Sequence, residues 1–271
     1  MFIFELEKLT FIGITLIVLY IYIFIAFLVG TAKKDNSVMD IFYGGGFILI
    51  AWTTLILNGN YSLREIIVTI IVTIWGFRLS GYVFIRNRGK GEDKRYQNMR
   101  KKWGNNVVIN SLLRIYLFQG LIIFLVGFPV IYINISVNPT LWWLDYIGIF
   151  IWIIGFLFES VGDYQLYSFL NDSKNQGKVF DKGLWHYTQH PNYFGEVIQW
   201  WGIYIISIGV LPWGFLTFFG PLLINYMIIN VSGVRLLNKR FEGDSEYAKY
   251  KRRTSQFIPL PPKKAIQENR E

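Results

Sequence analysis

The two histidines of the chain both lie in the stretch "GLWHYTQHPNYFGE", directly before an apolar run. Pro191 suits the first turn of a helix, because its missing N–H costs nothing there. If a helix begins at this proline, Asn192 and Glu196 are four residues apart and share one face. The free amides of such a helix start can bind an anion, and His190 and Tyr193 would flank it. The alternative is a capped interfacial helix start whose glutamate reaches outward to water.

A second polar group occurs in "ESVGDYQ", at the end of another apolar segment. Glu159 and Asp163 are again four residues apart, so two carboxylates lie on one helical face. An ionisable side chain inside a membrane span costs about 2.5–3.5 kcal/mol. The pattern fits a functional pair and ordinary boundary charges without a ligand about equally well.

A third group runs through "WGFRLSGYVFIRNRGKGEDKRY", where Arg78, Tyr82 and Arg86 follow one another at four-residue spacing. Guanidinium forks bind phosphates well, and Gly89 and Gly91 allow backbone amides to approach a ligand. The alternative is a basic cytoplasmic loop without a ligand. That alternative does not explain an arginine nearly two turns inside the apolar segment.

A fourth group consists of Asp40 and Tyr43, followed by three glycines. Small residues are common where membrane helices pack, so the glycines indicate a helix contact. Asp40 is either a functional carboxylate or a helix N-cap.

The elements that carry these groups are membrane helices. The chain has 271 residues, of which 53% are apolar and only 17% are charged, against about 25% charged in soluble domains. The run "LTFIGITLIVLYIYIFIAFLVG" (9–30) has no charged residue. It is long enough to cross a hydrocarbon core of about 30 Å, and nothing in it resembles a cleaved signal peptide.

Further apolar segments predict an all-α, polytopic integral membrane protein with about seven transmembrane helices. These segments are 41–57, 66–85, 110–133, 141–160, 192–211 and 213–232. Basic residues gather in alternate loops, including 86–106, and in the C-terminal tail, whereas the opposite side has only Lys8 and Arg64. This asymmetry places the N-terminus outside and the C-terminus in the cytoplasm. We expect a single domain over 1–262 and a polar tail over 263–271.

Composition excludes several classes of site. Without cysteine the chain has no disulfide or thiolate chemistry, and its two histidines do not complete a zinc site, so we expect no metal. The net charge of +9 reflects basic cytoplasmic loops rather than a nucleic-acid partner. No glycine-rich motif of a soluble nucleotide-binding fold is present.

The motifs quoted above resemble the DUF1295 family of membrane proteins, which belongs with the steroid 5-alpha-reductases. The stretch "VSGVRLLNKRFE…YAKYKRRTSQFIP" fits the same family, so the resemblance covers nearly the whole chain. Isoprenylcysteine carboxyl methyltransferases and phospholipid methyltransferases share a related "RHPxY…E" element, so the reaction is less specified than the family.

The resemblance implies a seven-span helical reductase whose NADPH enters from the cytoplasmic side. The resemblance also implies that three elements of the chain contact the cofactor. They are an "N-x-x-x-E" pair, a pair that reads "E-x-x-x-D" in this chain, and an "N-R-G" element. Together with the arginine stripe and the histidine stretch, the predicted cofactor-binding residues are Arg78, Arg86, Asn87, Arg88, Glu159, Asp163, Tyr187, His190, Asn192, Tyr193 and Glu196. The usual arginine before the second histidine is Gln189, which removes one phosphate-pairing charge.

The leading hypothesis is reduction of an activated C=C bond in a hydrophobic, steroid-, sterol- or prenoid-like substrate. A donor would stabilise the enolate that forms at the substrate carbonyl, and the candidates by location are Asp40, Tyr43 and Tyr82. A second hypothesis is a methyltransferase that uses S-adenosylmethionine, which has no phosphates for the arginines. A third is a lipid-binding protein without enzymatic activity.

Overall fold

The computed structural model describes residues 2–136, 140–234, 241 and 243–263. Throughout these ranges the regular structure is helical, apart from an isolated β-bridge between Thr188 and Ser255. The predicted all-α class is therefore confirmed. The α-helices are α1 (Phe2–Lys33), α2 (Val38–Asn58), α3 (Leu63–Asn87), α4 (Lys94–Trp103), α5 (Val107–Ser111), α6 (Phe118–Val126), α7 (Phe128–Asn134), α8 (Trp143–Asn171), α9 (Pro191–Ile208), α10 (Phe219–Tyr226) and α12 (Ser245–Arg253).

Six helical stretches in the described ranges are long and apolar enough to cross a membrane. They are Leu6–Lys33, Val38–Asn58, Leu63–Asn87, Lys94–Val126, Trp143–Asn171 and Gly214–Val231. Large apolar side chains on them face outward: Ile17 is 62% exposed, Phe77 67% and Phe150 64%. Lipid tails can cover such side chains, so the chain fits a multi-pass membrane protein.

The predicted span 192–211 forms helix α9, but α9 is not among these six stretches. Its polar residues Asn192, Glu196 and Gln199 reduce its hydropathy. The helix begins at Pro191, as the sequence predicted.

Two boundaries differ from the sequence prediction. The expected span 110–133 is interrupted, because one helical run ends at Val126 and α7 starts at Phe128. Pro129 causes the break, since it has no N–H to continue the ladder of the preceding helix. The expected loop 86–106 contains helix α4, whose N-cap Asp93 accepts a hydrogen bond from the backbone of Arg95 at 2.8 Å.

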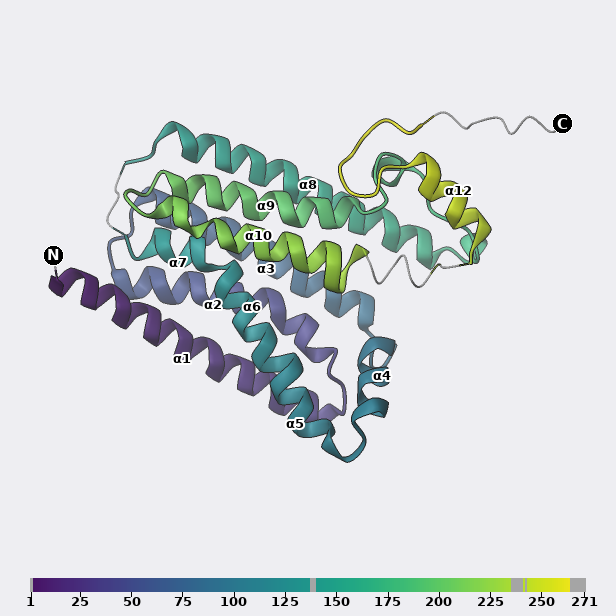
Figure 1. Cartoon of the computed structure of the whole chain (residues 1–271), viewed down its shortest axis with the longest axis horizontal. Helices are drawn as coiled ribbons and strands as arrows, with labels where there is room; N and C mark the ends of the chain where they lie inside the picture. The colour runs from purple at the N-terminus through teal and green to yellow at the C-terminus, as the bar shows by residue number, and fades with distance from the viewer. Residues whose placement is uncertain (1, 137–139, 235–240, 242, 264–271) are drawn as a thin grey trace. The chain divides into compact units, whose positions relative to one another are not determined.

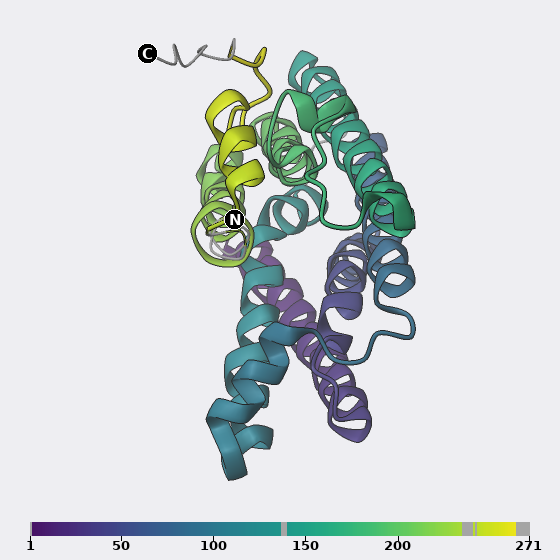
Figure 2. The same ribbon diagram turned by 90° about the vertical axis from the view of Figure 1, so that its right-hand side faces the viewer.

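The described chain divides into two compact units, and α8 and α9 contribute to both. The first unit comprises Met1–Ile147 and Ile203–Leu223. In it α1 packs beside α2, and α2 packs against α3 (Figures 1 and 2). Phe47 of α2 meets Trp75 of α3 edge to face, with ring centroids 5.2 Å apart.

Polar contacts also join the helices of the first unit. The side-chain amide of Asn134 in α7 donates to the Ala51 carbonyl at 2.9 Å and to two threonine hydroxyls, which helps to fix α2 and α3. Arg64 at the start of α3 forms a bidentate pair with Asp145, with both N–O distances 2.7 Å. Both side chains are at most 2% exposed.

The second unit comprises Gly148–Gly202 and Ile224–Glu271. Its helices α8 and α9 meet through glycines: a Cβ on Gly195 would lie 2.5 Å from the carbonyl oxygen of Gly155. A Cβ on Gly202 would lie 2.6 Å from the carbonyl oxygen of Gly148. The two backbones therefore approach more closely than other residues would allow.

Candidate active site

The close approach of α8 and α9 brings two polar pairs together in the second unit. The first joins Glu159 and Gln199, whose Nε2 atom donates to the carboxylate at 2.6 Å. The two residues are 2% and 1% exposed. Because a buried carboxylate is stable only with donors around it, this amide helps to stabilise the carboxylate. Gln199 was not among the predicted site residues, although it lies one turn beyond Glu196 on the same helix.

The second pair lies one helical turn further along α8. The side-chain amide of Asn192 donates to Asp163 at 2.9 Å, and Asp163 is 4% exposed. The sequence predicted each i,i+4 pair within its own helix. The structure also pairs residues across the two helices, so that Glu159 and Asp163 of α8 each meet an amide of α9.

Two acceptor atoms of these pairs are left over. The side-chain oxygens of Asn192 and Gln199 are buried and accept no hydrogen bond within the described residues. A buried acceptor without a donor costs about 1–3 kcal/mol. A ligand that brought hydroxyl or amide N–H groups would recover that cost.

His190 stands immediately before α9 and is 1% exposed. Its ring stacks on Tyr193, with centroids 5.4 Å apart, and neither ring nitrogen has a hydrogen-bond partner among the described residues. Burial, together with the positive charge of Lys251, lowers the pKa of His190 to about 4. The ring is therefore neutral at physiological pH, with one N–H to donate and one nitrogen to accept.

The other predicted residues of this stretch differ in exposure. Glu196 is half-buried on α9, whereas the side chain of Tyr187 is 47% exposed and packs edge-on against His186. Tyr187 therefore presents its ring to the surface rather than to the interior of its unit.

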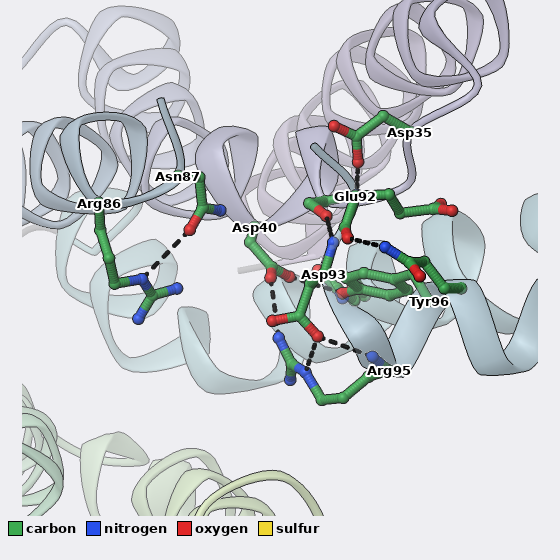
Figure 3. Close-up of polar contacts among 11 residues, drawn as sticks. Asp35, Asp40, Arg86, Asn87, Glu92, Asp93, Arg95 and Tyr96 are labelled. Atoms are coloured by element: carbon green, nitrogen blue, oxygen red, sulfur yellow. Dashed lines mark hydrogen bonds and ion pairs between the residues drawn. The ribbon is translucent and has the colours of Figure 1, made fainter. Parts of the chain in front are cut away.

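A separate polar cluster surrounds Asp40 in the first unit (Figure 3). The hydroxyl of Tyr96 donates to one oxygen of this carboxylate at 2.6 Å, and Arg95 donates to the other at 3.0 Å. Asp40 is not the N-cap of α2, because Ser37 occupies that position. The hydroxyl of Ser37 instead accepts a hydrogen bond from the backbone of Asp93 at 2.7 Å.

The same cluster fixes the loop that precedes α4. Arg100 forms two hydrogen bonds to Glu92, of 2.9 and 3.0 Å, and the backbone of Asn36 donates to this carboxylate at 2.8 Å. Burial raises the pKa of Glu92, but these hydrogen bonds outweigh burial and bring the pKa below its usual value. Arg95 and Tyr96 were not among the predicted site residues, because both fall in the expected basic loop 86–106.

The arginine stripe lies on one continuous helix, as predicted. Arg78 and Tyr82 are half-buried on α3, and the Arg86 guanidinium lies over the Tyr82 ring at 5.6 Å. Arg86 also donates to the side chain of Asn87 at 3.2 Å (Figure 3). Arg88 is the exposed C-cap residue of the helix.

Tyr43, the remaining predicted residue, packs its ring edge-on against Phe47, with centroids 5.2 Å apart. This contact belongs to the interior of the first unit, next to the Phe47–Trp75 pair.

The donor and acceptor sets of α8 and α9 fit parts of a dinucleotide. The leftover oxygens of Asn192 and Gln199 can accept from ribose hydroxyls or a carboxamide, and the carboxylates can do the same. Neither helix contains lysine or arginine. These two helices can therefore bind the uncharged hydrogen-bonding groups of such a ligand. They contain no lysine or arginine that could bind its phosphates.

Comparison with known proteins agrees with the architecture. A segment of 71 residues is 32% identical to 3-oxo-5-alpha-steroid 4-dehydrogenase 1 from Bos taurus. It covers 26% of this chain and 28% of the relative, so the match spans under a third of either protein. No solved structure matches the chain significantly. Residues 26–254 match the family described as "Protein of unknown function (DUF1295)". A match over most of the chain means that this membrane protein belongs to the DUF1295 family.

Proposed function

We propose that the protein is a membrane-embedded, NADPH-dependent reductase of an activated C=C bond in a hydrophobic steroid-, sterol- or prenoid-like substrate. The observation that carries the proposal is the pairing of two buried acids of α8 with two amides of α9, with two buried acceptor atoms left over. The similarity to a 3-oxo-5-alpha-steroid 4-dehydrogenase supports it. Dehydrogenation of a 3-oxo steroid and reduction of the corresponding enone are one reaction in opposite directions.

In this proposal α8 and α9 bind the hydrogen-bonding groups of the cofactor. Asn192 and Gln199 accept from ribose hydroxyls or the carboxamide, and Asp163 and Glu159 hold these amides in place. His190 adds a neutral donor and acceptor at the start of α9, and Tyr193 orients its ring. Tyr187 and Glu196 complete the proposed cofactor-binding residues of this unit.

The phosphates require cations, and the arginines of α3 are the proposed source. Arg78, Arg86 and Arg88 provide guanidinium forks that suit phosphate oxygens. Asn87 holds the Arg86 side chain through its 3.2 Å hydrogen bond. A 2′-phosphate adds a charge for these arginines, which favours NADPH over NADH.

The chemistry needs a hydride at the β-carbon and a proton at the α-carbon of the enone. When bound, NADPH would supply the hydride and would itself be oxidised to NADP⁺, and the proton would come ultimately from water. A donor near the carbonyl stabilises the negative charge that develops on its oxygen. We assign this task to the first-unit group, in which Tyr96 donates to Asp40 at 2.6 Å, with Tyr43 and Tyr82 as the other candidates.

For the membrane topology we propose seven spans, with α9 as the seventh beside the six apolar stretches. The N-terminus lies outside, and the C-terminus and the cofactor opening lie in the cytoplasm. Because the chain has no cysteine, an introduced cysteine can be labelled uniquely. Lys90→Cys should react only after the membrane is opened, whereas Asn60→Cys should react from outside. The reverse pattern would overturn the orientation.

The function is tested by thermal unfolding of the purified protein in lipid nanodiscs. NADPH should raise the unfolding midpoint more than NADH, and S-adenosylmethionine should leave it unchanged. Asn192→Leu should abolish the NADPH shift, whereas the control Gly81→Ala should keep it, because the space around Gly81 is open. A shift only with S-adenosylmethionine would indicate a methyltransferase. No shift with either compound would favour a lipid-binding protein.

The reaction is tested by oxidation of NADPH in the presence of hydrophobic enones, including 3-oxo steroids with a 4,5 double bond. Tyr96→Phe should reduce kcat while the affinity for NADPH is unchanged. An unchanged kcat in this variant, with Tyr82→Phe or Tyr43→Phe impaired instead, would move the donor role to that residue.

A further inference from the structure

The chain after α12 lies along the loop that leads into α9. The backbone N–H of Gln189 donates to the Ser255 carbonyl at 2.9 Å, and the hydroxyl of Thr188 donates to the Phe257 carbonyl at 2.7 Å. Further on, the backbone N–H of Leu260 donates to the Tyr187 carbonyl at 3.0 Å. Three successive loop residues are thus bonded to one short segment of chain.

The side chain of Gln189 forms further hydrogen bonds, separate from the one made by its backbone. Its Nε2 atom donates to the Thr254 carbonyl at 2.7 Å and approaches the Lys251 carbonyl at 3.4 Å, and the residue is 3% exposed. These carbonyls belong to the C-terminal end of α12, where helix carbonyls lack partners within the helix. From the sequence, Gln189 was expected to remove a positive charge that pairs with a cofactor phosphate, because it stands where the family usually has arginine. The structure directs its amide to a helix end instead.

Two more contacts hold the same segments together. The hydroxyl of Tyr250 in α12 donates to the Trp185 carbonyl at 2.6 Å, and Tyr250 is 3% exposed. The ring of Phe257 meets Phe194 of α9, with centroids 6.0 Å apart. The segment therefore contacts both the loop and the helix that carry the proposed cofactor residues.

We propose that Thr254–Lys263, here called the C-terminal clamp, positions His190 and Asn192 for ligand binding, and that Gln189 is a positioning residue of this clamp. The physical reason is that the loop residues directly before His190 are bonded to the clamp. His190 is preceded by two residues whose backbone or side-chain polar groups bond to the clamp. Asn192 lies only two residues further on.

The proposed role of Gln189 requires a side chain that donates hydrogen bonds. The position needs donors for carbonyl groups, and it makes no use of an acceptor: the Gln189 Oε1 atom is buried without a hydrogen-bond partner in the described part of the chain. Arginine has donors only, and a cation is favourable at a helix C-terminus. Gln189→Arg should therefore preserve the clamp, and Gln189→Leu should release it.

The chain offers an internal reporter for this test, because it contains two histidines. In the protein with isotope-labelled histidine, NMR follows both rings against pH. In Gln189→Leu the midpoint of His190 should rise from about 4 toward the ordinary 6.5, because water reaches the ring. The His186 signal serves as the reference, and Leu170→Ala, whose side chain is 69% exposed and lies outside the clamp, serves as the control variant.

The second measurement is the dissociation constant of NADPH, and this arm rests on the proposed function. Gln189→Leu and Thr188→Val should weaken binding about tenfold, equivalent to 1.4 kcal/mol, and Gln189→Arg and Thr188→Ser should restore it. If Gln189→Leu does not fold, Thr188→Val carries the comparison. Unchanged His190 titration in both variants would overturn the clamp. A preference for NADPH over NADH that grows in Gln189→Arg would show a phosphate ligand instead.

The two proposals fail in different ways. If the wild-type protein binds no NADPH, the proposed function is wrong, while the histidine titration still reports on the clamp. If NADPH binds and the titration is unaffected by either substitution, the clamp is wrong and the proposed function stands.

Discussion

The side-chain amide of Gln199 donates a 2.6 Å hydrogen bond to Glu159 across two helices and 40 residues of sequence. This contact gives a buried carboxylate a donor inside a unit whose two facing helices contain no lysine or arginine. The amide of Gln199 therefore supplies one donor to this carboxylate.

Gln199→Leu removes this donor and should lower the free energy of unfolding by about 1–3 kcal/mol. Glu159→Gln should cost less, because its side-chain oxygen can still accept from Gln199. Thermal unfolding in nanodiscs measures both variants, with Tyr164→Phe as a control because Tyr164 is 70% exposed. Equal stability of Gln199→Leu and wild type would mean that another group supports the carboxylate.

Gly195→Ala tests the close contact of α8 and α9. The new Cβ would lie 2.5 Å from the Gly155 carbonyl oxygen, so the helices must separate, at a cost of about 1–3 kcal/mol. Separation should also weaken NADPH binding, since both polar pairs cross this contact. The matched control is Gly81→Ala on α3, where alanine meets nothing within 4 Å and should stabilise the helix slightly.

Arg64→Met should lower the free energy of unfolding by about 3–5 kcal/mol, because it leaves the buried carboxylate of Asp145 without its guanidinium partner. The double variant Arg64→Met with Asp145→Leu should recover much of this loss. Chemical denaturation of the two proteins gives the comparison. A double variant as unstable as the single one would mean that the pair contributes more than mutual neutralisation.

The stability should depend on pH through His190. Its pKa is about 4 in the folded protein and ordinarily 6.5, so the unfolded chain binds a proton first as the pH falls. The free energy of unfolding should therefore decrease between pH 6.5 and 4, by on the order of 3 kcal/mol. His190→Phe should flatten this part of the curve, and His186→Phe should not. An identical pH curve for His190→Phe would contradict the buried neutral ring.

The sequence predicts the helical class and the start of α9 at Pro191 because apolar runs and proline act locally. It could not predict that Glu159 pairs with Gln199, since that contact depends on how two helices pack. The expected basic loop 86–106, which contains α4, shows the same limit. Charge alone marked it as solvent-exposed, but Tyr96 turns inward to Asp40, and this depends on the chain reversal between α3 and α4.

The pairing of Arg64 with Asp145 also has a consequence for biosynthesis. Asp145 follows Arg64 by 81 residues, so at about 5–20 residues per second the ribosome needs roughly 4–16 s to supply it. The ion pair can form only after the start of α8 has been synthesised, so α3 and α8 become joined by it late, once half of the chain has been made.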